Sequence, residues 1–126
     1  MTDFAKLLLR LSFGLSLALA HGLPKLMSFS EKSPDFSDPF MVGPVLSMAF
    51  AVFGEFFCGL LVALGALTRV AVVPIVIVMA TAFFKIHTGQ DWSVREPAAL
   101  FGIAFICIGL LGAGKFSFDA LIFKKR

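Results

Sequence analysis

The sequence predicts an all-α membrane protein, built as an antiparallel bundle of four transmembrane helices. The first observation is composition: 59% of the 126 residues are hydrophobic and 15% are charged, with a mean hydropathy of +0.95, whereas soluble domains carry about 25% charged residues. The second is that each apolar stretch far exceeds the roughly 9–11 residues of a membrane strand and lacks its alternation. Because one crossing needs about 20 apolar residues, the chain has room for about four spans and no second domain.

Polar segments mark the limits of these spans. We expect helices within a single domain, residues 1–126, over residues 4–26, 43–67, 70–86 and 97–111. Residues 27–42 are rich in serine, proline and acidic side chains, which predicts a loop. The turn Thr68-Arg69 is so short that the second and third spans must be antiparallel neighbours. The polar far end of the first span, with no small-residue cleavage site, argues against a removed signal peptide.

Small residues recur on one face of the first two predicted helices, where they allow close helix contact in lipid. They are Gly14, Ala18 and Gly22 in the first span and Ala51, Gly59, Ala63 and Ala66 in the second. We interpret them as seams within the bundle. A homo-oligomer contact would use the same pattern and remains an alternative.

The distribution of Lys and Arg predicts the orientation. The side that holds both termini collects seven basic residues: Lys6, Arg10, Arg69, Lys115, Lys124, Lys125 and Arg126. The other side has four, Lys25, Lys32, Lys85 and Arg95, together with most of the acidic residues. We therefore expect the protein in the plasma (inner) membrane, and the positive-inside rule places both of its termini on the cytoplasmic side. We interpret the net charge of +3 as a consequence of this topology and expect no nucleic-acid partner. The basic tail, residues 124–126, is expected to touch anionic lipid headgroups.

Two charged residues fall inside the predicted helices. Glu55 lies about twelve residues from either end of the second span, too deep for its side chain to reach water. An intramembrane carboxyl of this kind is either functional or a structural lock between helices. Arg10 either extends to the surface or points inward, and in the second case it would pair with Glu55 across an axial offset of roughly 9 Å.

A second polar group is predicted at the end of the bundle away from the termini. It comprises His21, Lys25, Lys85, His87 and Glu96, with Trp92 at the headgroup level. We predict that it forms the mouth of a cavity whose floor is Glu55. Helix capping is the alternative for Glu96, since residues 93–96 match a capping box. Two histidines at similar depth would also suit haem ligation, although interfacial side chains explain them as well. Cys58 and Cys107 are predicted to be buried thiols, and no metal-ligand spacing occurs.

The polar and small residues of the spans fall in distinctive motifs, Arg10-Leu-Ser-Phe-Gly14, Ala20-His21-Gly22-Leu-Pro-Lys25-Leu, and Glu55-Phe-Phe-Cys-Gly59-Leu-Leu-Val-Ala-Leu-Gly65 followed by Leu67-Thr68-Arg69. Together these motifs resemble the DoxX family of small four-helix membrane proteins. Further agreement comes from His87, residues 92–96, and Gly112-Ala-Gly-Lys-Phe-Ser117-Phe-Asp119, which is similar to the family's closing Gly-x-Gly-x-x-Ser-x-Asp. Ala113 departs from the family, where many members have proline.

The resemblance implies the fold more strongly than an activity. The family is named for a small subunit of a thiosulfate:quinone oxidoreductase, and other members are linked to quinone or thiol stress. A quinone site needs an apolar groove and a proton-exchanging group. The candidate catalytic residues are Glu55, His21 and His87, and the candidate substrate-binding residues are Arg10, Lys25, Lys85, Trp92 and Glu96.

Two functions follow from this interpretation. The first is a redox-associated subunit that binds quinone or relays protons for a partner oxidoreductase, which would be required because the sequence has no evident electron carrier of its own. The alternative is a non-enzymatic membrane scaffold or small-solute permease, in which Arg10 and Glu55 only lock the helices together.

Overall fold

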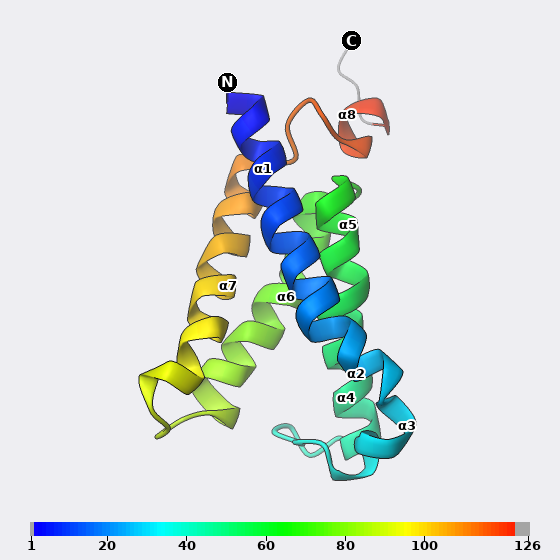
Figure 1. The fold of residues 1–126 in the computed structure, drawn as a ribbon, viewed down its shortest axis with the longest axis vertical. Helices are drawn as coiled ribbons and strands as arrows, with labels where there is room; N and C mark the ends of the chain where they lie inside the picture. The colour runs from blue at the N-terminus through cyan, green and yellow to red at the C-terminus, as the bar shows by residue number, and fades with distance from the viewer. Residues whose placement is uncertain (1, 123–126) are drawn as a thin grey trace.

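The computed structural model describes residues 2–122, which contain four helices long and apolar enough to cross a membrane (Figure 1). They cover Thr2–Met27, Pro44–Leu64, Thr68–Ile86 and Trp92–Leu111. No strand occurs within residues 2–122. The predicted all-α four-helix architecture is therefore confirmed. The expected headgroup contact of Lys124, Lys125 and Arg126 lies outside the described residues.

Three of the four spans contain a π-helical turn. The first span consists of α1 (Thr2–Leu15), η1 (Ser16–Gly22) and α2 (Leu23–Met27), and the second of α4 (Pro44–Val52), η3 (Phe53–Phe57) and α5 (Cys58–Leu64). The third consists of α6 (Thr68–Thr81) and η4 (Ala82–Ile86), whereas the fourth is the single helix α7 (Trp92–Leu111). Such turns widen the helix locally and are frequent at functional sites.

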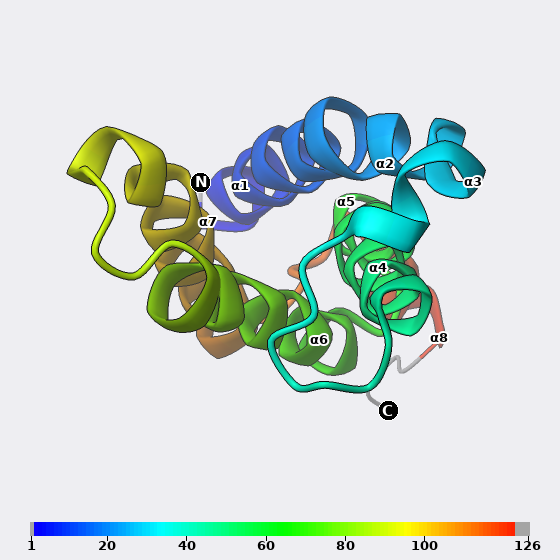
Figure 2. The same cartoon turned by 90° about the horizontal axis from the view of Figure 1, so that it is seen from below.

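The connections are more structured than the sequence predicted. The expected loop before the second span includes α3 (Phe29–Lys32) and the 3₁₀ turn η2 (Ser33–Asp35), and a short helix, α8 (Phe118–Ile122), follows the fourth span. Seen from below, the segment between η2 and α4 crosses the end of the bundle (Figure 2). We call this segment, residues 36–43, the strap.

The fourth span begins earlier than predicted, at Trp92, and Asp91 precedes it as the N-cap. The predicted capping box of Ser93 and Glu96 is therefore wrong, because both residues lie within the helix and Glu96 is exposed. Contacts with the third span stabilise this first turn. Arg95 donates from Nη2 to the Phe83 carbonyl at 3.1 Å and stacks on the Phe83 ring, and Trp92 packs edge-on against the same ring.

Glycines join the first and second spans at close range. A Cβ atom at Gly14 would lie 2.8 Å from the Gly59 carbonyl oxygen, and one at Gly22 would lie 2.6 Å from the Phe56 amide nitrogen. Neither distance leaves room for a side chain. The prediction that small residues form a seam within the bundle is therefore confirmed at these positions.

The apolar core lies between the four spans. It includes Leu17 of η1, Val62 of α5, Ile75 of α6 and Phe105 of α7. Large apolar side chains on the outer faces of all four spans stay exposed, as lipid-facing residues should. In Figure 1 the spans approach one another near the chain ends and diverge toward the opposite end.

Candidate functional site

A partly buried ion pair joins the first two spans. Lys25 Nζ of α2 donates to Glu55 Oε1 of η3 at 2.7 Å. The Glu55 side chain is 8% exposed and that of Lys25 is 30% exposed. Close packing at Gly22 brings the two backbones near enough for this contact. The lysine therefore neutralises the intramembrane carboxylate at a depth where an unpaired charge would be costly.

Arg10 is not the partner of Glu55, so the alternative in which these two residues pair is wrong. Arg10 points inward and is 1% exposed, but its Nη1 donates to the carbonyls of Ala63 at 3.0 Å and Val62 at 3.4 Å. These carbonyls belong to the last turn of α5, where helical acceptors run out of intrahelical donors; the Val62 carbonyl also accepts from the Gly65 amide at 3.0 Å. Ala63 lies eight residues beyond Glu55, roughly 12 Å along the helix axis.

Arg10 also links the second span to the segment that follows α7. Its Nη2 donates to the Phe116 carbonyl. Gly65 ends α5 with a φ of +75°, and a side chain there would collide with the guanidinium. Arg10 therefore fastens helix ends at the terminal side of the bundle and does not line the cavity described next.

A cavity of about 870 Å³ lies in the half of the bundle away from the termini. Its polar lining includes Glu55, Lys25, His21 and His87, four of the predicted site residues. Most of the wall is apolar and aromatic, with phenylalanines from the strap, from the second span and from α7: Phe36, Phe40, Phe50, Phe53 and Phe101. The structure thus brings all three candidate catalytic residues to one space.

The two histidines reach the cavity from different spans. His21 lies in η1 and its ring packs edge-on against Phe101, with centroids 5.3 Å apart. His87 follows η4, and its Nδ1 lies 2.8 Å from Gln90 Oε1. Each ring therefore has one orienting contact.

The other predicted binding residues do not line the cavity. Lys85 is exposed and its Nζ lies 5.2 Å from the centre of the Phe40 ring, so it approaches the cavity only through a wall residue. Trp92 is exposed and contacts Phe83. Glu96 is exposed on the first turns of α7.

Asp38, which the sequence analysis did not single out, holds the strap in place. Its Oδ1 accepts hydrogen bonds from Ser47 Oγ at 2.7 Å and the Val42 amide at 3.0 Å, while Oδ2 accepts from the Gly43 amide at 2.9 Å. The Ser47 hydroxyl, followed by these amides, lowers the pKa of Asp38, although partial desolvation opposes the shift. The available signal was an Asp in a turn-rich loop shortly before Gly43-Pro44, since Asp side chains accept hydrogen bonds from nearby backbone amides in turns.

The cysteines lie in different environments. Cys58 belongs to the core, as predicted, but Cys107 is exposed on α7, so its predicted burial is wrong. In the described part of the chain, no group of three or more His, Cys, Asp and Glu side chains could hold a metal ion.

Comparison with known proteins decides the family. The DoxX family model matches residues 5–88, two thirds of the chain. The chain belongs to the DoxX family. Searches of curated proteins and of solved structures found no match. DoxX membership and four apolar helices make the chain a multi-pass integral membrane protein.

The DoxX match includes every residue of the ion pair and both histidines, but it ends before Trp92, Glu96 and the closing motif. The structure gives that motif a role of its own. Ser117 Oγ donates to the Gly114 carbonyl and accepts from the Ala120 amide, and Asp119 accepts from the amides of Leu67 and Thr68. The motif therefore ties the closing segment to the turn between the second and third spans.

Proposed function

We propose that this DoxX protein binds a quinone-class ligand in the cavity and exchanges protons with it, as the membrane subunit of a partner oxidoreductase. The observation that carries the proposal is the meeting of the Lys25–Glu55 pair with two histidines in one largely apolar space. An isolated structural ion pair would need neither the cavity nor the histidines.

The cavity suits a planar ring with an apolar tail. Its volume of about 870 Å³ falls within the roughly 300–1,000 Å³ of small-molecule sites, which are typically apolar with a few polar groups. Phe36 and Phe40 of the strap and Phe101 of α7 offer aromatic faces to the ring. The tail would extend among the aliphatic side chains of α6 that line the same space, such as Ile77.

The polar residues supply hydrogen bonds and protons. The Lys25 ammonium has three N–H groups and uses one on Glu55, so it can donate another to a ring carbonyl. Reduction of a quinone to a quinol consumes electrons and protons together. The electrons come from the partner, and Glu55, His21 and His87 hold and transfer the protons.

The proposed location is the plasma (inner) membrane, with both termini in the cytoplasm. The excess of Lys and Arg at the end that holds the termini supports this orientation. A reporter fused to the C-terminus should then behave as cytoplasmic, and one inserted among residues 28–39 as extracytoplasmic. The opposite pair of signals would reverse the orientation.

The experiment is a titration of the purified protein in lipid nanodiscs with a short-chain ubiquinone analogue, followed by Trp92 fluorescence and by equilibrium dialysis. We expect saturable binding in the wild type. Lys25→Met should weaken it about tenfold, because it removes a charged hydrogen-bond donor. Lys32→Met is the matched control, since this lysine is exposed and outside the cavity lining, and it should bind like the wild type.

The scaffold or permease alternative predicts a different result. The structure separates Arg10 from Glu55, so a lock would rest on the Lys25–Glu55 pair instead. Lys25→Met would then destabilise the protein, and no saturable quinone binding would be seen even in the wild type. That result, with no quinone in an organic extract of the purified protein, would contradict the proposal. A haem absorption band in the same sample would also contradict the proposal, because it would indicate that the histidines ligate haem.

A further inference from the structure

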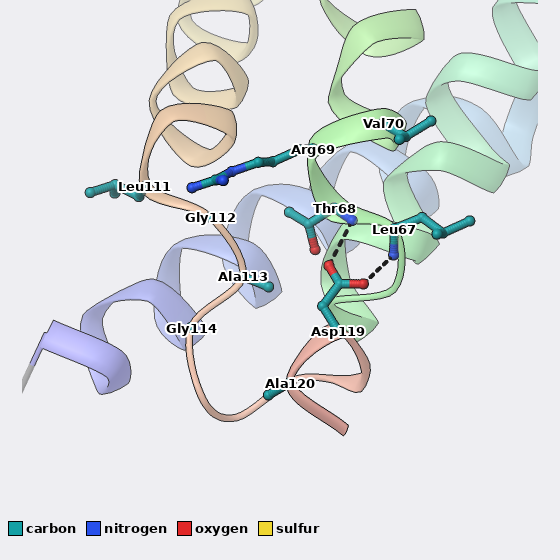
Figure 3. Close-up of a pocket in the computed structure, with 10 residues that line it drawn as sticks. All are labelled: Leu67, Thr68, Arg69, Val70, Leu111, Gly112, Ala113, Gly114, Asp119 and Ala120. Carbon is teal, nitrogen blue, oxygen red and sulfur yellow. Dashed lines mark hydrogen bonds between the residues drawn. The ribbon is translucent and has the colours of Figure 1, made fainter. Parts of the chain in front are cut away.

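A second pocket lies at the opposite end of the bundle from the quinone cavity, with a volume of about 460 Å³ (Figure 3). It is formed by the first residues of α6, the end of α7 and the segment that leads to α8. Because two membrane spans end here, the pocket lies at the level of lipid headgroups. We call it the terminal pocket.

Arg69 supplies a positive charge on one side of the terminal pocket. Its Nε donates to the Gly109 carbonyl at 3.1 Å, which fixes the side chain across the end of α7. Gly112 leaves room for the guanidinium, since a Cβ there would lie 2.9 Å from Arg69 Nη2. Figure 3 shows the side chain extended toward Leu111 and Gly112. The side chain is exposed, so its terminal amino groups can bind a ligand from the bilayer.

Asp119 supplies a negative charge on the other side. Its carboxylate accepts from the amides of Leu67 at 2.6 Å and Thr68 at 2.8 Å (Figure 3). Each oxygen keeps a further lone pair, because a carboxylate offers about four acceptor positions. Among the described residues, Asp119 and Arg69 line one pocket without forming a salt bridge to each other.

Thr68 adds an unsatisfied donor between the two charges. The residue is 1% exposed, and its hydroxyl has no hydrogen-bond partner in the part of the chain that the structure describes. A buried hydroxyl without a partner costs free energy. Figure 3 places its side chain between Arg69 and Asp119, facing the pocket.

We propose that the terminal pocket binds the headgroup of a zwitterionic aminophospholipid from the adjoining leaflet. Arg69 and the Thr68 hydroxyl bind the phosphate, and Asp119 accepts hydrogen bonds from the ammonium group. The acyl chains lie along exposed apolar side chains beside the pocket, Val70 and Leu110.

The two charges also determine selectivity. A headgroup without an ammonium group gives Asp119 no charged hydrogen-bond donor and brings the phosphate charge near that of the carboxylate. A choline headgroup is a cation but has no N–H to donate. The pocket therefore favours ethanolamine over glycerol and choline headgroups with the same acyl chains.

The experiment is native mass spectrometry of the delipidated protein, incubated with equal amounts of phosphatidylethanolamine, phosphatidylcholine and phosphatidylglycerol of one acyl composition. We expect preferential retention of phosphatidylethanolamine. Arg69→Gln should reduce that retention about tenfold, as expected for loss of a charged hydrogen-bond donor. Lys115→Gln, at an exposed cation outside the pocket lining, should not change it.

Two more variants test the pocket itself. Asp119→Asn keeps an acceptor oxygen for the helix amides but removes the charge, so the preference for ethanolamine over choline should disappear. Ala120→Leu fills the pocket with both charges intact and should abolish retention, and it carries the test if Asp119→Asn does not accumulate. Equal retention of the three lipids by the wild type, or displacement of the bound lipid by inorganic phosphate, would overturn the proposal.

Discussion

Arg10 is the residue whose replacement should damage the fold most. We consider Arg10→Met, which preserves most of the side-chain length and removes the guanidinium. The native group is 1% exposed and donates to three carbonyls, those of Val62, Ala63 and Phe116. Met leaves the Ala63 and Phe116 carbonyls without this donor, while the Val62 carbonyl keeps the Gly65 amide.

The expected magnitude follows from opposing contributions. A hydrogen bond from a charged donor contributes about 1.5–3 kcal/mol. The variant loses three such bonds but no longer desolvates a charge, which recovers several kcal/mol. We therefore expect a net loss of about 2–4 kcal/mol in the free energy of unfolding. Arg10→Lys should lose less, because it keeps the charge but cannot reach both sets of carbonyls at once.

The assay is thermal unfolding in a mild detergent, monitored by circular dichroism. Arg10→Met should lower Tm by on the order of 10 °C, and Lys115→Met, an exposed cation at the same end of the bundle, should leave it unchanged. Quinone binding by the folded Arg10→Met protein should be close to that of the wild type, because Arg10 does not line the cavity. A variant of wild-type stability, or one that folds normally but no longer binds quinone, would refute this account of Arg10.

Three further predictions follow from the packing, the strap and the ion pair. Gly22→Ala should lower the free energy of unfolding by about 1–3 kcal/mol in the same assay, because its Cβ would lie 2.6 Å from the Phe56 amide nitrogen. Gly102→Ala is the control and should be neutral, since its Cβ would lie 3.5 Å from the nearest atom. The lowered pKa of Asp38 means that its contribution to strap order is complete above the unfolded value of about 3.9 and is lost as the pH falls through the lower folded value. The protection of the amides in residues 36–43 against hydrogen exchange, corrected for the intrinsic pH dependence of exchange, should therefore fall on acidification in the wild type and be low at every pH in Asp38→Ala. Glu55→Gln should accumulate in membranes like the wild type, since the amide still accepts a hydrogen bond from its lysine partner. The quinone-linked activity of those membranes should be lost. Failure of the variant to accumulate would instead indicate an obligatory ion pair.

The fold was largely predictable from the sequence because lipid leaves few options. An apolar segment of about 20 residues must satisfy its backbone groups internally, so it becomes a helix whatever its neighbours are. The spacing of small residues also predicted a seam within the bundle, and the structure places it between the first two spans at Gly14 and Gly22. The early start of the fourth span was missed because it depends on Arg95 and Trp92 packing against Phe83, a contact between spans.

The site was predictable in part. Depth alone identified Glu55, and topology brought His21 and His87 to the same end. The partner of Glu55 was not predictable, because axial offsets do not reveal that Arg10 donates to carbonyls at the end of α5 instead. The strap residues that line the cavity and the role of Asp38 depend on the path that a loop takes. Composition predicts only that this loop is polar.

Photoaffinity labelling with an azidoquinone tests the central claim most directly. The protein in nanodiscs is labelled with and without excess unlabelled quinone, digested, and mapped by mass spectrometry. The account predicts labels on cavity-lining residues of the strap and of α4, such as Phe40 and Phe50, that the competitor suppresses. Labels confined to lipid-facing residues such as Ile103 and Leu110, unaffected by competition, would contradict it.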